Sequence, residues 1–239
     1  MKKLLPLFFI LFLGLASCQK DPSTLPAKIK FNFGMTPLSA GEGLKDASVN
    51  TDQSGQVYLT MDGGTLVVST IEFEGRRQDA SDVFFTADFD PPIVVDLETE
   101  TMNRLVQFDI PQGIYERIEL KFHLGASGQL PLVMTGEANL PIFGQKPVRF
   151  EYQYSEPVRV VAQSSTGGNI VLKKDVPGTA TVDVNASHLF RLVNVGLLVS
   201  SELHNENGGE IILINQDMNS PIFNVIANRL SQSFEVIFE

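Results

Sequence analysis

The sequence predicts a mainly β protein, built as an antiparallel β-sandwich with one short amphipathic helix near the C-terminus. Short runs of β-branched, aromatic and other apolar residues recur along the chain, and several of them alternate apolar with polar residues. Glycine- and proline-rich turn sequences separate these runs, and many short strands at close spacing are typical of a sandwich or barrel. Helix signals are few and come late in the chain.

The clearest strand is predicted for residues 114–124. From Arg117 to Leu124 every second residue is apolar, and the residues between them are charged or histidine. This period of two indicates one buried face and one face in contact with water. Further runs of this kind predict strands at residues 28–33, 57–61, 65–74, 83–87, 93–97, 105–110, 130–140, 148–155, 158–163, 169–174, 179–184, 211–214 and 234–238.

Three short sequences indicate how some of these strands are joined. Ile110-Pro111-Gln112-Gly113 has proline and glycine where a type I turn favours them. Asp62-Gly63-Gly64 and Asn207-Gly208 have the composition of hairpin turns, because glycine and asparagine accept the positive φ angles that such turns require.

One helix is predicted at residues 221–231. Ser220 is suited to cap its start, and Pro221 suits its first position. Ile222, Ile226 and Leu230 recur every four residues, which places them on one helix face. Residues 185–190 have the composition of a shorter helical turn.

The chain divides into a leader at residues 1–17, a tether at 18–27 and a β-sandwich domain at 28–163. Residues 164–239 form either a second β-rich domain or a continuation of the same sandwich. The serine- and glycine-rich sequence at 163–168 marks the possible boundary. The sequence leaves both alternatives open.

The first residues have the organisation of a signal peptide. Lys2 and Lys3 precede an apolar run at residues 4–13, which is too short to cross a bilayer as a helix. Leu15-Ala16-Ser17-Cys18 then resembles the bacterial lipobox, and this resemblance implies cleavage before Cys18 and acylation of its thiol. A plain secretory peptide is the alternative. Cys18 is the only cysteine of the chain, so an intramolecular disulfide is excluded.

The residues after Cys18 bear on localisation. Gln19-Lys20-Asp21 resembles the export signal of surface lipoproteins from Bacteroidetes-type bacteria, although only one acidic residue precedes Pro22. The resemblance implies an outer-membrane lipoprotein on the cell surface, and the periplasmic face of the outer membrane is the alternative. Acylated Cys18 would make the membrane a partner of the protein.

The charge of the chain excludes one class of partner. Of 18 Lys and Arg residues, Lys2 and Lys3 leave with the leader, so 16 remain against 28 Asp and Glu residues, a formal net charge of −12. Nucleic-acid binding depends on basic groups that neutralise phosphates, so DNA and RNA are not expected partners. The same charge disfavours electrostatic binding to anionic lipids.

Part of the body resembles a known family. Residues 66–74, Val95-Asp96-Leu97 and Ile110-Pro111-Gln112-Gly113-Ile114-Tyr115 before the alternating strand are similar to an uncharacterised domain family common in bacterial lipoproteins. The resemblance covers residues 66–124. It implies a transthyretin-like or immunoglobulin-like β-sandwich with an adhesion or ligand-binding role, and it assigns no catalytic residues.

Two sets of residues are candidates for ligand binding. Phe150, Tyr152 and Tyr154 would share one face of a strand, where they form either a sugar-stacking strip or part of the core. The alternation with polar residues favours the core. Asp79, Asp82, Asp88 and Asp90 could bind calcium, but they lack the glycine and terminal glutamate of an EF-hand loop, so acidic turn residues are the favoured interpretation.

No catalytic signature is present in the sequence. It has no HExxH metal motif, no GxSxG nucleophile and no phosphate-binding glycine loop, and His123, His188 and His204 are far apart. We therefore expect a surface-anchored, non-catalytic lipoprotein that binds a protein or glycan ligand or serves adhesion, and no cofactor. The alternatives are a glycan-handling lipoprotein, either a carbohydrate-binding protein or a glycoside-hydrolase accessory, and a calcium-dependent module.

Overall fold

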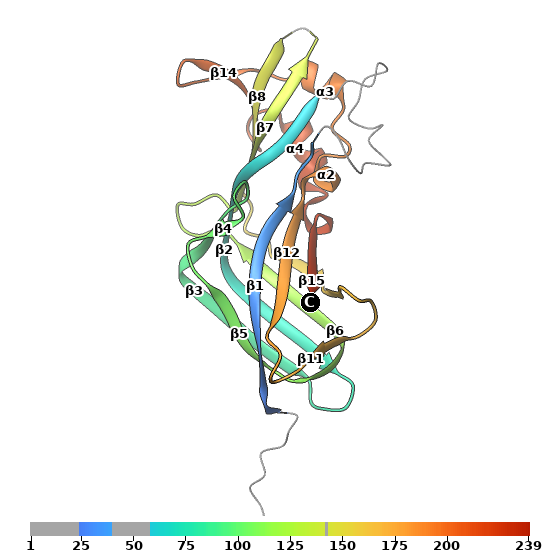
Figure 1. Ribbon diagram of the computed structural model, residues 1–239. Helices are drawn as coiled ribbons and strands as arrows, with labels where there is room; N and C mark the ends of the chain where they lie inside the picture. The colour runs from blue at the N-terminus through green and yellow to red at the C-terminus, as the bar shows by residue number, and fades with distance from the viewer. Residues whose placement is uncertain (1–23, 40–57, 142) are drawn as a thin grey trace, which may run out of the picture.

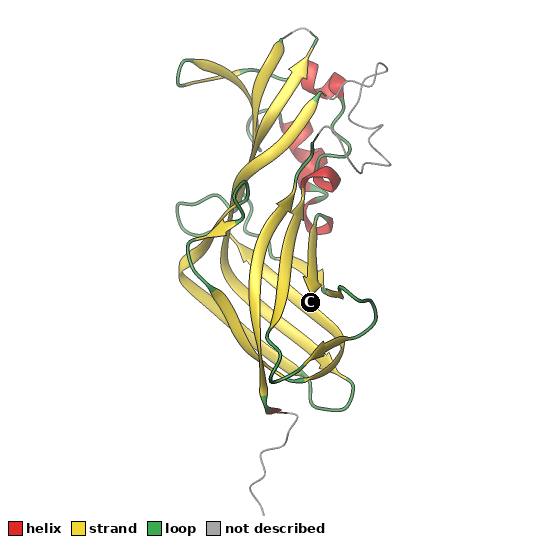
Figure 2. Cartoon of the chain, viewed as in Figure 1, coloured by secondary structure: helices red, strands yellow, loops and turns green. Residues whose placement is uncertain are grey.

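The computed structural model describes residues 24–39, 58–141 and 143–239. The leader, Cys18 and most of the predicted tether lie outside these residues. Pro26 and Ala27 belong to the first strand and not to the predicted tether, and Ala27 is fully buried. The chain is mainly β, as predicted, with a few short helices (Figure 2). No helix among the described residues has the length and apolar composition needed to span a membrane.

The smaller of the two sheets has five strands in the order β10-β15-β12-β1-β5. Its strands come from both halves of the chain, and β1 lies between strands that follow it much later (Figure 1). Their bounds are β1 Pro26–Thr36, β5 Val106–Pro111, β10 Gln163–Ser164, β12 Gly178–Asn185 and β15 Phe234–Phe238.

The larger sheet has ten strands and runs the whole length of the molecule (Figure 1). Seven of them follow the order β11-β6-β2-β7-β8-β14-β13, while β3 pairs with β2 and β4, and β9 pairs with β6. Their bounds are β2 Leu59–Arg77, β3 Val83–Asp96, β4 Thr101–Met102, β6 Gly113–Leu124, β7 Leu132–Leu140, β8 Gly144–Tyr152, β9 Val158–Val161, β11 Ile170–Leu172, β13 His204–Glu206 and β14 Gly209–Ile214.

Both sheets are mixed, which corrects the prediction of a purely antiparallel fold. Strands β1 and β12, β10 and β15, and β8 and β14 pair in parallel. Each parallel pair joins strands separated by a long stretch of chain, which leaves room for the crossover that parallel neighbours need. Residues 164–239 contribute strands to both sheets, so their strands are built into the same sheets as those before them.

The two sheets pack against each other around aromatic side chains. Phe122 of β6 lies between Phe33 of β1 and Phe234 of β15, with ring centroids 6.1 and 6.5 Å away. Phe31 of β1 contacts Phe108 of β5 and Phe238 of β15 within its own sheet. The alternation predicted for residues 117–124 is confirmed, because every apolar residue of that stretch is buried.

The predicted turn at Asp62-Gly63-Gly64 is wrong, because β2 runs without interruption from Leu59 to Arg77. Here the register against β7 shifts between Met61 and Gly63, as at a β-bulge. Gly64 has a φ of +144°, and a Cβ atom on it would lie 2.1 Å from the carbonyl oxygen of Val133. The glycines therefore let two strands approach closely within the sheet.

One of the other two predicted turns is seen in the structure, while the type I turn predicted at residues 110–113 is not, because only Gln112 lies between β5 and β6. Asn207 and Gly208 both have positive φ, 51° and 84°, and join β13 to β14 as a hairpin. The chain at Ile110-Pro111-Gln112-Gly113 carries β5 of one sheet into β6 of the other. At this bend the buried Tyr115 hydroxyl donates a hydrogen bond to the carbonyl oxygen of Pro111, 2.6 Å away.

Three short α-helices lie against the upper half of the larger sheet in Figure 1. The predicted C-terminal helix is α4 Ser220–Ala227, which follows Asn219 as its N-cap and ends before residue 231; the 3-10 helix η3 Leu230–Gln232 completes the segment. The predicted turn at 185–190 is α2 Ala186–Leu189, capped by Asn185. No predicted helix corresponds to α3 Val195–Val199, which Asn194 caps.

Candidate functional site

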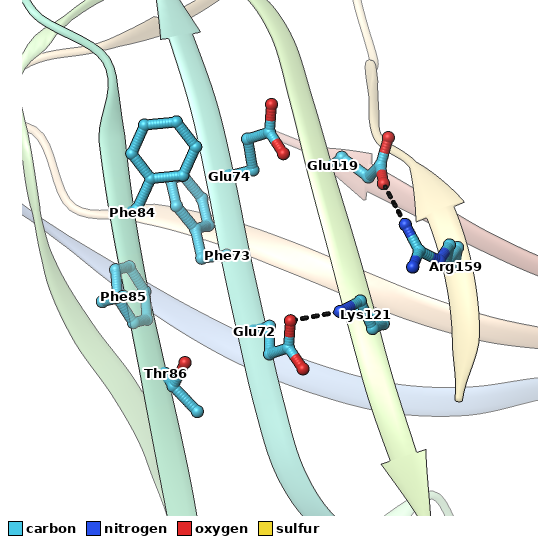
Figure 3. A pocket seen from close by; sticks show the side chains of 9 residues that line it. All are labelled: Glu72, Phe73, Glu74, Phe84, Phe85, Thr86, Glu119, Lys121 and Arg159. Carbon is cyan, nitrogen blue, oxygen red and sulfur yellow. Dashed lines mark hydrogen bonds and ion pairs between the residues drawn. The ribbon is translucent and has the colours of Figure 1, made fainter. Parts of the chain in front are cut away.

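A polar concave surface lies on the outward side of the larger sheet over β3, β2, β6 and β9 (Figure 3). Here the alternation of each strand directs its polar residues away from the core. We call this surface the charged face. It consists of Thr70, Glu72, Glu74, Phe84, Thr86, Asp88, Glu119, Lys121, His123, Arg159 and Val161.

One row of the charged face is centred on Glu72. Thr86, Glu72, Lys121 and Arg159 are cross-strand neighbours in that order. The carboxylate of Glu72 accepts hydrogen bonds from Lys121 Nζ and, at 2.5 Å, from His123 Nε2. The bonds from Lys121 and then His123 lower the pKa of Glu72, so this carboxylate is held ionised.

The next row places two carboxylates opposite each other. Phe84, Glu74, Glu119 and Val161 are neighbours across the four strands, and like charges in such positions repel. Nearby arginines offset this repulsion. Glu119 contacts Arg117 at 2.5 Å and Arg159 at 3.6 Å, and Glu74 contacts Arg76 at 3.4 Å.

A shallow cavity of about 340 Å³ opens on these two rows. Phe84 lies at its edge with 64% of its surface exposed, the second most exposed large apolar side chain of the described residues. Figure 3 shows its ring beside the carboxylate of Glu74, with Lys121 and Arg159 across the cavity. The cavity thus offers an aromatic surface, hydrogen-bond acceptors and cationic donors to a ligand.

Phe150, Tyr152 and Tyr154 do not form a solvent-exposed strip on which a sugar could stack. Phe150 and Tyr152 are 0% and 6% exposed, because Phe223 of α4 stacks on both. Tyr154 is 40% exposed and forms a T-shaped contact with Tyr152. The interpretation of these residues as core is confirmed for the first two, and no three-ring platform for a sugar is formed.

The four aspartates of the calcium hypothesis take separate positions. Asp79 and Asp82 lie in the turn between β2 and β3, where the Asp82 carboxylate accepts a bond from the Arg77 backbone. Asp88 accepts a 2.8 Å bond from the Thr70 hydroxyl, and Asp90 lies exposed further along β3. Within residues 24–39, 58–141 and 143–239, no three His, Cys, Asp or Glu side chains are grouped to bind a metal ion.

The three histidines lie in different parts of the fold. His123 belongs to the charged face, as the polar side of its predicted strand indicated. His188 in α2 bonds through Nε2 to the Arg229 guanidinium at 2.9 Å, and burial together with that cation lowers its pKa. His204 lies on β13.

Comparisons of the chain with protein-family models, with curated proteins and with solved structures return no match. The charged face is therefore interpreted from its own chemistry. Phe84 and Arg159 were not among the predicted site residues. The pair Phe84-Phe85 was a usable signal, since two adjacent residues of a strand point to opposite faces and one ring must leave the core.

Proposed function

We propose that this protein is a surface-anchored, non-catalytic lipoprotein that binds its ligand on the charged face. The observation that carries the binding role is the exposed ring of Phe84 beside a cavity lined by ion pairs. Exposed aromatic residues surrounded by polar groups are common at binding sites, because they offer contact area at low cost in conformational entropy. The anchor rests on the lipobox-like sequence that ends at Cys18.

The proposed fold type is an immunoglobulin-like β-sandwich. The bond from the Tyr115 hydroxyl to the Pro111 carbonyl supports this assignment, because it spans the bend between the two sheets as a tyrosine corner does in immunoglobulin-like domains. Tyr115 is also the tyrosine of the Pro-x-Gly-x-Tyr sequence on which the resemblance to bacterial lipoprotein domains rests.

The binding role is tested by photo-crosslinking on intact cells. Phe84 is replaced with the photoreactive amino acid benzoylphenylalanine, and Leu192 with the same residue as the matched control, since Leu192 is 52% exposed and lies just after α2. We expect irradiation to give one adduct of defined mass from position 84 and none from position 192. Equal yields from both positions would count against a ligand site at the charged face.

A glycan is the ligand class that the composition of the cavity favours as a second candidate. Sugars stack on aromatic rings and form hydrogen bonds with carboxylates, and Phe84 and Glu74 offer both groups side by side (Figure 3). On a glycan array we expect Phe84→Ala to lose most of the signal of the wild type, while Leu192→Ala keeps it. An array without any signal from the wild type would leave a protein as the ligand class.

A further inference from the structure

The end of the body from which the N-terminal segment leaves is assembled from three connections. They are the turn between β2 and β3, the bend between β5 and β6, and the turn between β11 and β12, which lie near the start of β1 at the lower end of Figure 1. Gln112 joins several of these parts. Its backbone N–H donates to the Leu25 carbonyl at 2.8 Å, and its side-chain oxygen accepts from the Lys174 N–H at 3.2 Å. We call this region the tether end.

Three apolar side chains are exposed at the tether end. Ile114 and Val171 are cross-strand partners on β6 and β11, 40% and 52% exposed, and Val176 in the next turn is 57% exposed. A mainly apolar hollow of about 300 Å³ lies beside the first two and is continued by Ala80 and Leu172. The remaining large exposed apolar residues of the described chain are Phe84, Leu105, Tyr154, Val161, Leu192 and Ile237, which lie elsewhere in the fold.

Lysines adjoin these apolar residues. Lys173 and Lys174 lie between Val171 and Val176, and both are exposed. Apolar side chains that project from a surface among lysines are typical of protein segments that rest in a membrane interface, where the lysine ammonium stays at the level of the headgroups. Asp79 and Asp175 lie in the same loops, so the attraction would depend on the apolar residues more than on net charge.

The length of the chain ahead of the tether end limits its distance from a lipid anchor. Thr24, the first described residue, follows Cys18 by six positions. A fully extended chain covers at most about 3.5 Å per residue, so Thr24 lies within roughly 20 Å of the Cys18 backbone. Acyl chains on Cys18 would therefore hold the tether end, rather than the opposite end of the molecule, next to the bilayer.

From this geometry we infer that the tether end is a second membrane contact, in which Ile114, Val171 and Val176 enter the interface of a lipid bilayer. The inference rests on the proposed acylation of Cys18. Apolar side chains that enter the interface add buried apolar area to the attachment that acyl chains on Cys18 provide. The contact also fixes the orientation of the body, with the β7–β8 end directed away from the membrane (Figure 1).

The test uses full-length lipoprotein isolated from membranes and reconstituted in vesicles of phosphatidylcholine and phosphatidylglycerol. Mass spectrometry first establishes whether Cys18 is acylated; an acylated Cys18 cannot react with thiol dyes. Val176→Cys and Val171→Cys then carry an environment-sensitive fluorophore. Asn139→Cys is the matched control, because Asn139 is exposed on β7, near the end of the molecule opposite the tether end. Both positions at the tether end are already exposed, so these changes leave the core intact.

We expect the dye at positions 171 and 176 to emit at shorter wavelength and to be quenched by nitroxide-labelled lipids, while the dye at position 139 behaves as in water. If Cys18 is acylated but the dyes at all three positions show the same emission and quenching, the membrane contact is overturned and the lipid anchor is not affected. An unmodified Cys18 in the membrane-isolated protein would overturn the anchor, and the membrane contact with it.

Discussion

At the scale of single residues, Tyr115 has the most consequential position. Its ring is fully buried, and its hydroxyl holds the bend that leads from one sheet to the other. Burial raises the pKa of Tyr115 to about 12, so the hydroxyl remains a hydrogen-bond donor at physiological pH. Gly75 makes room for this ring, because a Cβ atom there would lie 2.5 Å from a ring carbon of Tyr115.

Removal of the Tyr115 hydroxyl tests this role. We expect Tyr115→Phe to lower the free energy of unfolding by about 1 kcal/mol, because the Pro111 carbonyl loses its donor while the ring remains packed. Urea titration followed by circular dichroism measures the change. Tyr154→Phe, at a position 40% exposed, is the control and should leave the midpoint nearly unchanged. Equal effects of the two substitutions would contradict a special role for the bend.

Asp183 is a source of instability at neutral pH. It lies on β12 opposite Gly34 and Glu235. Burial, and then the negative charges of Glu235 and Glu100, raise its pKa, although a hydrogen bond with Thr36 opposes the shift. A carboxyl group whose pKa is higher in the folded state binds more protons there, so its contribution to stability is largest at low pH and is lost as pH rises through that pKa.

The consequence for Asp183→Asn is a higher melting temperature than the wild type at pH 7. The difference should shrink as pH falls through the folded-state pKa and vanish below about 4, the unperturbed aspartate pKa, because the carboxyl group is then protonated in both states. Differential scanning calorimetry across this range measures it. The control is Asp217→Asn, at an exposed site. A lower melting temperature for Asp183→Asn at pH 7 would show that the bond with Thr36 outweighs the cost of burying the charge.

At the scale of elements, α4 determines whether the aromatic residues of β8 are buried or exposed. Phe223 stacks on Phe150 and Tyr152 with centroids 5.8 and 6.4 Å away, and it is 1% exposed itself. The strand alone would present a ring-rich face to solvent. The helix turns that face into core, which is why sequence alternation could favour burial but could not identify what covers these rings.

Truncation of this contact should be costly. We expect Phe223→Ala to destabilise the fold by about 3–5 kcal/mol, as large-to-small changes in a core do. The chain has no tryptophan, so its emission comes from four tyrosines, of which Tyr152 and Tyr154 contact Phe223. Acrylamide should quench this emission more strongly in the variant as Tyr152 becomes accessible, while Leu192→Ala changes neither quantity. Unaltered quenching in a destabilised Phe223→Ala would mean that α4 does not protect the strand.

The sequence located strands well and their connections less well. Alternation in β6 was a reliable guide because one face of that strand is core and the other is water. Asp62-Gly63-Gly64 was misread because a glycine pair suits both a turn and a bulge, and only the approach of β7 distinguishes them. Phe84 was missed because the register of β3 against β2, which the sequence does not contain, decides which of two phenylalanines faces outward.

At the scale of the whole molecule, β2 joins the two halves of the larger sheet. Its residues 59–66 pair with β7, residues 65–75 pair with β3, and residues 68–77 pair with β6. Buried residues from strands of both sheets belong to a single apolar cluster. Partners of strands such as β1 and β12 could not be predicted from the sequence, because residues far apart in the chain form them.

This continuity predicts a single cooperative unfolding transition. Denaturation by urea, followed by far-ultraviolet circular dichroism and by tyrosine emission, should give coincident curves. Tyr58, Tyr115, Tyr152 and Tyr154 are spread over both halves of the larger sheet, so the emission reports on each half. Two separate transitions would instead assign residues 28–163 and 164–239, or the two halves of the sheet, to independent domains.

The position of β1 also determines how the protein responds to tension. Its first half is hydrogen-bonded to β5 and most of its length to β12, so it has neighbours on both sides. A pull on the chain ahead of Pro26 acts along the strand axis, while the bonds to the neighbours run across it. Those bonds share the load in shear and cannot be peeled apart one after another. If the protein is held by its N-terminus in flowing liquid, we therefore expect the chain ahead of Pro26 to become fully extended before β1 separates from its neighbours.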